Sequence, residues 1–236
     1  MAGRLEGKSA VVAGGTGGLG RAVSLAFLRE TANVIVTYRN EAEFAALNAL
    51  AGDSVSRLTG HLLDVTDEAA VSRIFQDATA RVDVLVNTVG AYAGGLPLWK
   101  TDSAAFERML SLNLRAGYVL SRAIVPQMLK QGSGAIINVA ARAAVDHAAG
   151  AAAYAASKAA AVAMMDCLAA DLRGTGVRVN SILPSIIDTD ANRHVMPGAD
   201  FSKWPAPEDI ASVILFLAGD EAKLIHGASI PVYGSF

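Results

Sequence analysis

Short apolar strands alternate with helical segments along this chain, and that alternation constrains the fold more than any other feature. The strands are predicted at residues 9–13, 33–38, 54–63, 82–87, 135–139, 177–183 and 228–232. Helices are predicted between them at residues 21–28, 41–50, 68–80, 103–129 (with a bend near Pro126), around Tyr154, and 207–217. Apolar strands separated by helices indicate a sheet covered on both faces. The predicted fold class is α/β: a single doubly wound domain over residues 1–236, with a mostly parallel seven-stranded sheet.

The composition argues against several classes of protein. The chain has 236 residues and a formal net charge of −2, so nothing favours a nucleic acid or an anionic membrane as a partner. Its one cysteine, Cys167, cannot form a disulfide within the chain, which favours a reducing, cytoplasmic location. The four histidines lack the spacing of metal ligands, so no metal site is predicted. The apolar stretch at residues 148–165 holds Lys158 and is not expected to span a membrane.

A glycine-rich turn at residues 14–20 (Gly-Gly-Thr-Gly-Gly-Leu-Gly) joins the first predicted strand to the first helix. Glycines at 14, 18 and 20 would let the backbone approach phosphates, and the N-terminus of the helix supplies N–H groups and a partial positive charge. Arg21 follows where a P-loop would need Lys-Ser/Thr, so the turn is not a P-loop. The motif indicates a dinucleotide pyrophosphate site, although a tight turn without a ligand is the simpler interpretation of the turn alone.

Tyr154 and Lys158 are four residues apart in a predicted helix, so their side chains share one face. A tyrosine pKa of roughly 10 makes a poor proton shuttle at neutral pH, and a nearby cation lowers it. The pair is therefore a candidate general acid or base. Taken alone, the pair is more simply a partly buried tyrosine and a surface lysine that share a helix face.

Four segments each follow a predicted strand: residues 14–20, 87–90, 140–141 and 184–189. Ligands of parallel α/β sheets bind at the carboxyl ends of the strands. We therefore expect these segments to meet at one edge of the sheet, which strengthens the interpretation of the glycine turn.

With these motifs in this order, the sequence resembles the short-chain dehydrogenases/reductases over essentially its whole length. The resemblance implies a Rossmann-type NAD(P)-binding domain and an oxidoreductase acting on a small-molecule substrate. It implies that Tyr154 is the proton donor, that Lys158 binds the nicotinamide ribose and tunes Tyr154, and that Asn113 holds a proton-relay water. The cofactor contacts that it implies are Gly14, Thr16, Gly18, Leu19, Gly20, Arg39, Asp64, Val65, Asn87, Gly90, Lys158, Pro184, Ile187 and Thr189.

One position departs from the family pattern. The family usually has a serine 13 positions before the tyrosine, where it orients the substrate carbonyl; here that position is Ala141. The loss of one donor to a developing oxyanion can cost roughly 10²–10³ in rate. The chain is therefore either a weak carbonyl reductase or an enzyme whose substrate does not need that serine.

Dihydropteridine-reductase-like members of the family also lack this serine, and the chain resembles them at residues 89–95 and 183–204. That resemblance implies a quinonoid dihydropterin, an activated acceptor, as the substrate. It places Ala141 at the substrate, Tyr92 stacked on it, and Trp204 in a lid within the irregular substrate loop at about residues 184–206. Core packing of a loop is the alternative role for Trp204.

The end of the second strand bears on the cofactor. An NAD-preferring site would end this strand with an acid for the ribose 2′-hydroxyl. Tyr38 stands there and Arg39 follows, and an arginine suits a 2′-phosphate. This favours NADPH over NADH, although Arg39 could simply be a solvated surface residue.

Two other functions stay open from the sequence. One is a carbonyl, 3-ketoacyl or alcohol oxidoreductase that works without the serine, and the other is a catalytically weak NADP-binding sensor. The resemblance also implies a homodimer or homotetramer formed through the long helix around Asn113 and the helix of Tyr154. Alanines at 159, 160 and 163 would permit close helix approach.

Overall fold

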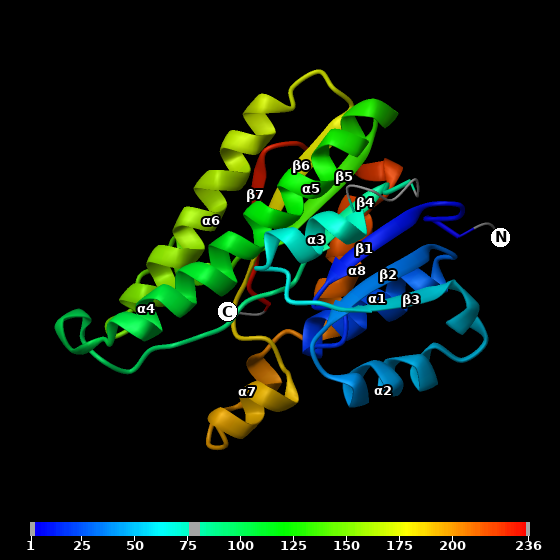
Figure 1. Ribbon diagram of the computed structural model, residues 1–236. Coiled ribbons are helices and arrows are strands. Elements are labelled where there is room, and N and C mark those ends of the chain that lie inside the picture. The colour runs from blue at the N-terminus through cyan, green and yellow to red at the C-terminus, as the bar shows by residue number, and fades with distance from the viewer. Residues whose placement is uncertain (1–2, 76–80, 235–236) are drawn as a thin grey trace.

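The computed structural model describes residues 3–75 and 81–234. Within them, seven strands form one sheet in the order β3-β2-β1-β4-β5-β6-β7, and every neighbouring pair is parallel. The prediction of an α/β domain with seven strands is confirmed, and the sheet is parallel throughout (Figure 1). The strands are β1 (Ser9–Ala13), β2 (Asn33–Tyr38), β3 (Leu58–Leu62), β4 (Val84–Asn87), β5 (Gly134–Val139), β6 (Val177–Pro184) and β7 (Ala228–Val232).

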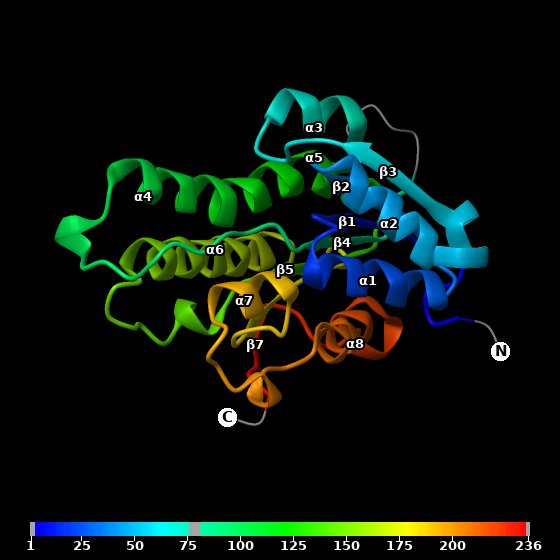
Figure 2. The same ribbon diagram turned by 90° about the horizontal axis from the view of Figure 1, so that it is seen from below.

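Helices cover both faces of the sheet. Figure 2 shows α1 (Gly18–Arg29) and α8 (Pro207–Ala218) on one face, with α3 (Glu68–Phe75) and α5 (Ala116–Gln131) on the other. Alternate residues of a strand point to opposite faces: in β1, Ala10 and Val12 belong to the core beneath α1 and α8, whereas Val11 and Ala13 belong to the core beneath α3 and α5. This two-sided burial explains why the strands are apolar without alternation.

The remaining helices are α2 (Glu41–Ala51), α4 (Ser103–Leu110), α6 (Ala152–Asp171) and α7 (Asp190–Val195). The helix α2 lies along the edge strand β3, and α6 packs against β6 and α4. Figure 1 shows α7 standing apart from the helices that cover the sheet.

Several predicted boundaries were wrong. Residues 52–57, of which 54–57 were expected to be extended, form a 3-10 helix before β3 begins. The long helix predicted at 103–129 is two helices, α4 and α5, joined by a π-helical turn at Ser111–Arg115. Pro126 lies inside α5, and the helix continues past it to Gln131. The loop at 184–206, expected to be irregular, contains α7 and a 3-10 turn at Phe201–Lys203. The predicted helical residues 76–80 lie outside the described part.

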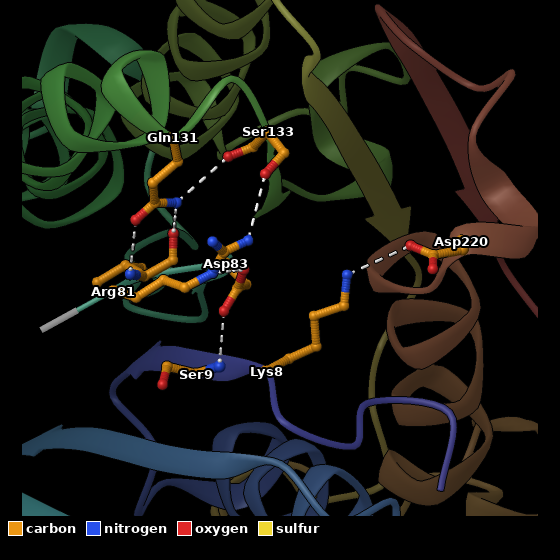
Figure 3. A network of polar contacts seen from close by, with 8 residues as sticks. Lys8, Ser9, Arg81, Asp83, Gln131, Ser133 and Asp220 are labelled. Atoms are coloured by element: carbon orange, nitrogen blue, oxygen red, sulfur yellow. Dashed lines mark hydrogen bonds and ion pairs between the residues drawn. The ribbon is translucent and has the colours of Figure 1, made fainter. Parts of the chain in front are cut away.

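A polar network ties the strands together at their amino ends, opposite the edge where the motifs gather (Figure 3). The buried carboxylate of Asp83 accepts hydrogen bonds from the Ser9 N–H (3.0 Å) and from Arg81 Nε (2.7 Å). The side chain of Gln131, at the end of α5, bonds the N–H and the carbonyl of Val82. These contacts anchor β1, β4 and α5 to one another.

Candidate functional site

The glycine turn at residues 14–20 occupies the carboxyl end of β1 and leads directly into α1. Gly14 has a φ of +73°, a conformation that favours glycine. A Cβ on Gly20 would overlap the carbonyl oxygen of Gly14, so only a residue without a side chain fits there. A Cβ on Gly18 would lie 2.6 Å from Thr189 Cγ2, in the loop after β6. The turn is thus tight, and it meets the loop after β6 as the sequence predicted.

The N-terminus of α1 is open to an anion. Gly17 precedes the helix and has no side chain to cap the first N–H groups, and the first turn contains no acidic residue. Free N–H groups and the helix dipole both favour negative charge at such an end. Backbone N–H groups at a tight glycine turn are the arrangement that a pyrophosphate requires.

The segments that follow β2 and β3 hold three of the predicted cofactor contacts: Arg39, Asp64 and Val65. Arg39 is exposed, and its charge contributes to lowering the pKa of the Asp64 carboxyl. The main cause of that lowered pKa is the hydrogen bond from the Thr66 N–H. Val65 is buried beside Asp64. These positions lie at the carboxyl edge of the sheet, where an adenosine would extend from the glycine turn.

A neighbouring carboxylate escaped the sequence interpretation. Thr16, predicted to contact the cofactor, donates its hydroxyl hydrogen to Glu43 Oε2 at 2.8 Å. Glu43 lies in the first turn of α2. Acidic residues are common in the first turn of a helix, so nothing in the sequence pointed to this contact.

Lys158 is a buried cation at the centre of the site. Its side chain is 5% exposed, and its Nζ donates to the carbonyl oxygen of Val139, the last residue of β5, at 3.0 Å. Burial lowers the pKa of Lys158 to about 8. The bond fixes α6 against the end of β5.

Tyr154 lies one helical turn before Lys158 and is mostly buried. Burial raises the pKa of Tyr154 to about 12, and the neighbouring Tyr92 contributes in the same direction. The sequence predicted a pKa lowered by the lysine, and for this structure that prediction was wrong because desolvation of the phenolate dominates. At neutral pH the phenol therefore carries its proton and can donate it.

Asn113 lies in the π-helical turn between α4 and α5 and is 2% exposed. Its Oδ1 accepts from the Ala91 N–H at 2.8 Å, and its Nδ2 donates to the Ala91 carbonyl at 3.0 Å. A Cβ on Gly90 would lie 2.9 Å from Asn113 Oδ1 and 3.0 Å from Lys158 Nζ. Gly90 therefore keeps open a small space that both polar atoms border. π-Helical turns often occur at functional sites.

Asn87 ends β4 and is 2% exposed. Its Nδ2 donates to Asn138 Oδ1 on β5 at 3.1 Å, and its Oδ1 accepts from the Val89 N–H at 3.2 Å. Asn87 thus holds the start of the loop that carries Gly90. Asn87 therefore contributes to the site indirectly, because its side chain holds the backbone of this loop in place.

The predicted substrate residues differ in their surroundings. Ala141 follows β5 and is buried at 7% exposure. Tyr92 is 64% exposed, and its ring meets that of Tyr154 edge to face with centroids 5.0 Å apart. The structure therefore brings Tyr92 to Tyr154, the predicted proton donor.

Trp204 belongs to a small cluster within the loop after β6. It is 9% exposed, and its ring lies 4.9 Å from that of Phe201, over which the Arg193 guanidinium also lies at 4.9 Å. Arg193 is in turn paired with Asp188, whose N–H donates to the Pro205 carbonyl. In this conformation Trp204 packs the loop, the alternative that the sequence left open.

The loop after β6 carries the last predicted cofactor contacts. Pro184 ends β6 and is buried, and Ile187 packs against the core beneath α1 and α8. Thr189 caps α7 through its hydroxyl, which accepts from the Asn192 N–H. Its methyl group faces Gly18, which places it beside the N-terminus of α1.

The residues at this edge fit a nicotinamide dinucleotide. The uncapped N-terminus of α1 suits the pyrophosphate, and the space kept by Gly90 leads to Lys158 and Asn113. In the described ranges, 3–75 and 81–234, no group of three His, Cys, Asp or Glu side chains could hold a metal ion. Among these same residues, no helix is long and apolar enough to cross a membrane.

Comparison with known proteins agrees with this geometry. A model of the short chain dehydrogenase family matches residues 8–199. The 3-oxoacyl-(acyl-carrier-protein) reductase FabG of Thermotoga maritima is 30% identical, covering 98% of both chains. The D-threitol dehydrogenase of Mycolicibacterium smegmatis is 32% identical, over 99% of this chain and 94% of its own. The structure of ElxO with NADP bound superimposes with a TM-score of 0.90 at 25% identity, over 96% of this chain and 97% of ElxO.

Proposed function

The chain belongs to the short-chain dehydrogenase family, and on that premise we propose that it is an NADPH-preferring reductase of an activated, conjugated acceptor such as a quinonoid dihydropterin. The coarser activity, an NAD(P)-dependent oxidoreductase, follows from the family itself. One observation carries the finer proposal: Ala141 is buried where the family resemblance expects a serine hydroxyl.

The residues divide the work as follows. A bound reduced nicotinamide supplies the hydride. Tyr154 holds a proton at neutral pH and can donate it to the substrate as negative charge develops there. Lys158 remains largely charged below its pKa of about 8, so that it stabilises the phenolate that forms. Asn113 borders the same space through Oδ1 and can accept a hydrogen bond from a relay water.

Ala141 separates the two substrate classes. A ketone gains from a second donor at its developing oxyanion, whereas a quinonoid acceptor spreads the charge over its conjugated system and depends less on one. Tyr92 offers an aromatic edge beside Tyr154, which suits a flat heteroaromatic substrate.

Reduction or oxidation at an ordinary carbonyl or alcohol is the alternative function, and the relatives favour it. Two of them are named as a 3-oxoacyl-(acyl-carrier-protein) reductase and a D-threitol dehydrogenase. The variant Ala141→Ser distinguishes the two functions. If the site is a weakened carbonyl site, the serine should raise kcat/KM on ketones by at least about tenfold. If the proposal holds, the serine leaves pterin reduction unchanged or impairs it.

The preference for NADPH rests on Arg39. Arg39 directly follows β2 and is exposed. Tyr38, the last residue of β2, donates its hydroxyl hydrogen to Glu41, so β2 does not end with an acid that could bind a ribose 2′-hydroxyl. Arg39→Asp should shift the kcat/KM ratio toward NADH, and Glu43→Gln, which removes a carboxylate near the turn, should shift it toward NADPH. Unchanged cofactor kinetics in Arg39→Asp would refute the assignment.

A cofactor-binding sensor without turnover is the remaining alternative. It predicts that wild-type protein binds NADPH but oxidises it with no acceptor in a panel of pterins, ketones and quinones. The retained Tyr154 and Lys158 speak against this alternative.

We also propose that the chain self-associates through α4, α5 and α6. A groove of about 580 Å³ lies between these helices, and its lining includes Leu114, Tyr118 and Met164. Tyr118, near the start of α5, is 43% exposed there, and a second copy packed on this groove would cover its ring. A monomeric mass in light scattering would contradict self-association.

A further inference from the structure

The hydroxyl of Ser157 joins Asn113 to the helix that carries Tyr154. Ser157 is fully buried, at 0% exposure. Its Oγ accepts from Asn113 Nδ2 at 2.9 Å and donates to the carbonyl oxygen of Tyr154 at 2.7 Å. No sequence pattern indicates this contact, because a serine between Tyr154 and Lys158 has no distinctive spacing of its own.

The hydrogen-bonding groups of the Asn113 amide are almost fully used. Its two N–H hydrogens go to the Ala91 carbonyl and to Ser157 Oγ, with only a weak further contact to Met109 Sδ. One lone pair of Oδ1 accepts the Ala91 N–H. Oδ1 also borders the position that a Cβ on Gly90 would take, at 2.9 Å.

Ser157 contributes to that arrangement from the catalytic helix. Because its own hydrogen is given to the Tyr154 carbonyl, its oxygen faces Asn113 as an acceptor. An amide rotated by half a turn would present Oδ1 to the Ala91 carbonyl and Nδ2 to the Ala91 N–H. The loop at Ala91 and the hydroxyl at Ser157 therefore hold Asn113 from two sides.

We propose that Ser157 is a positioning residue that holds the Asn113 amide between the loop at Ala91 and α6, so that the π-helical turn and α6 act as one unit during proton transfer. This inference rests on the proposed function, since Asn113 matters only where a proton is relayed. In this role Ser157 acts through Asn113, to which its hydroxyl is bonded.

The test compares Ser157→Ala with Ser212→Ala in the full chain. Ser212 is an exposed residue of α8, and its hydroxyl donates to the carbonyl of Glu208 in the same helix. Ser157→Ala should lower kcat roughly tenfold with an unchanged KM for NADPH, because the Asn113 amide is then held from the Ala91 side alone. Ser212→Ala should leave kcat unchanged. Ser157→Cys is the second variant, with similar size and a weaker acceptor, and its kcat should fall as well.

Two further readouts test whether Ser157 acts through Asn113. Hydrogen exchange at the Ala91 amide, which bonds Asn113 Oδ1, should speed up in Ser157→Ala and stay unchanged in Ser212→Ala. In a double-mutant cycle, Asn113→Ala combined with Ser157→Ala should lose no more activity than Asn113→Ala alone.

The outcomes are distinguishable from failure of the proposed function. If Tyr154→Phe abolishes turnover but Ser157→Ala keeps full kcat and normal Ala91 exchange, the role of Ser157 is refuted and the proposed function stands. If the losses of Asn113→Ala and Ser157→Ala simply add, Ser157 does not act through Asn113. If Tyr154→Phe keeps full turnover, the proposed function fails first.

Discussion

At the scale of single residues, Lys158 sets the expected pH dependence. Burial depresses its pKa from 10.5 to about 8, so the ammonium is present below about pH 8 and is lost above it. Tyr154 keeps its proton through this range, since its pKa is raised to about 12. We therefore predict that kcat/KM for reduction is flat from neutral pH to about pH 8 and falls above it. Initial rates measured across this range test the prediction, and a rate that keeps rising above pH 8 would contradict it.

The same burial affects stability. In the unfolded chain the lysine keeps its ordinary pKa of 10.5, so below about pH 8 the folded state bears the cost of a buried charge. This cost fades as the pH rises from about 8 toward 10.5, because the unfolded chain then binds the extra proton. Urea unfolding of Lys158→Met should lack this contribution. An identical pH slope of stability in wild type and variant would contradict the assignment.

Residue spacing predicted that Tyr154 and Lys158 share a helix face, because a helical repeat is a local property. It did not predict the direction of the tyrosine pKa shift, since desolvation depends on which segments cover the ring. The bond of Lys158 to Val139 and the contact of Ser157 with Asn113 also join distant parts of the chain. No local pattern encodes them.

At the scale of elements, the glycine turn offers a matched pair of substitutions. A Cβ on Gly20 would overlap the Gly14 carbonyl oxygen, whereas a Cβ on Gly17 would lie 3.5 Å from the same atom, an ordinary contact. We predict that Gly20→Ala weakens NADPH binding at least about tenfold, because the turn must open, and that Gly17→Ala binds within about threefold of wild type. Fluorescence titration with NADPH measures both. Equal affinities for the two variants would refute the packing argument.

Gly90 gives a second substitution at this scale. Its Cβ would fill the space that Asn113 Oδ1 and Lys158 Nζ border. Gly90→Ala should lower kcat by roughly tenfold or more because both polar atoms must shift. The neighbouring Gly95→Ala would meet no atom within 4 Å but is strained by its φ of +95°, so it controls for strain in the loop. If both variants lose the same activity, loop strain explains the effect.

Helices and strands with a clear hydrophobic pattern were predictable from the sequence. Elements that depend on contacts between distant residues were not. The strands and most helices follow from apolar runs and glycine or proline boundaries. The π-helical turn at Ser111–Arg115 arises where Asn113 turns inward to bond Ala91, a contact that the helical pattern of residues 103–129 conceals. The helix α7 is six residues long and capped by Thr189, too short for a periodic signal.

At the scale of the whole molecule, stability and chemistry lie at opposite edges of the sheet. Asp83 is 5% exposed and joins Ser9 and Arg81, while Asp220, at the same edge, has a side chain that is 88% exposed and pairs with Lys8. Asp83→Ala should lower the free energy of unfolding by about 1–3 kcal/mol, because the Ser9 N–H loses its acceptor. Asp220→Ala should change it by at most about 0.5 kcal/mol. Urea denaturation compares them, and a loss of kcat in folded Asp83→Ala would show that the two edges are coupled.

The convergence of the loops after β1, β4, β5 and β6 was predictable, because the carboxyl ends of parallel strands meet at one edge of the sheet. The substrate was not predictable in the same way, because it depends on side chains contributed by separate loops, such as Tyr92 and Ala141. The fold can thus be inferred from the sequence pattern, whereas the substrate has to be inferred from the side chains that line the site.

The most direct test of the account is the initial rate of NADPH and NADH oxidation with quinonoid dihydropterin, beside small ketones and quinones, by wild type and Tyr154→Phe. We predict fast turnover with the pterin, a preference for NADPH, and loss of turnover in Tyr154→Phe while NADPH still binds. Turnover with ketones alone would contradict the proposed substrate class, and undiminished turnover in Tyr154→Phe would contradict the role of Tyr154 as the proton donor.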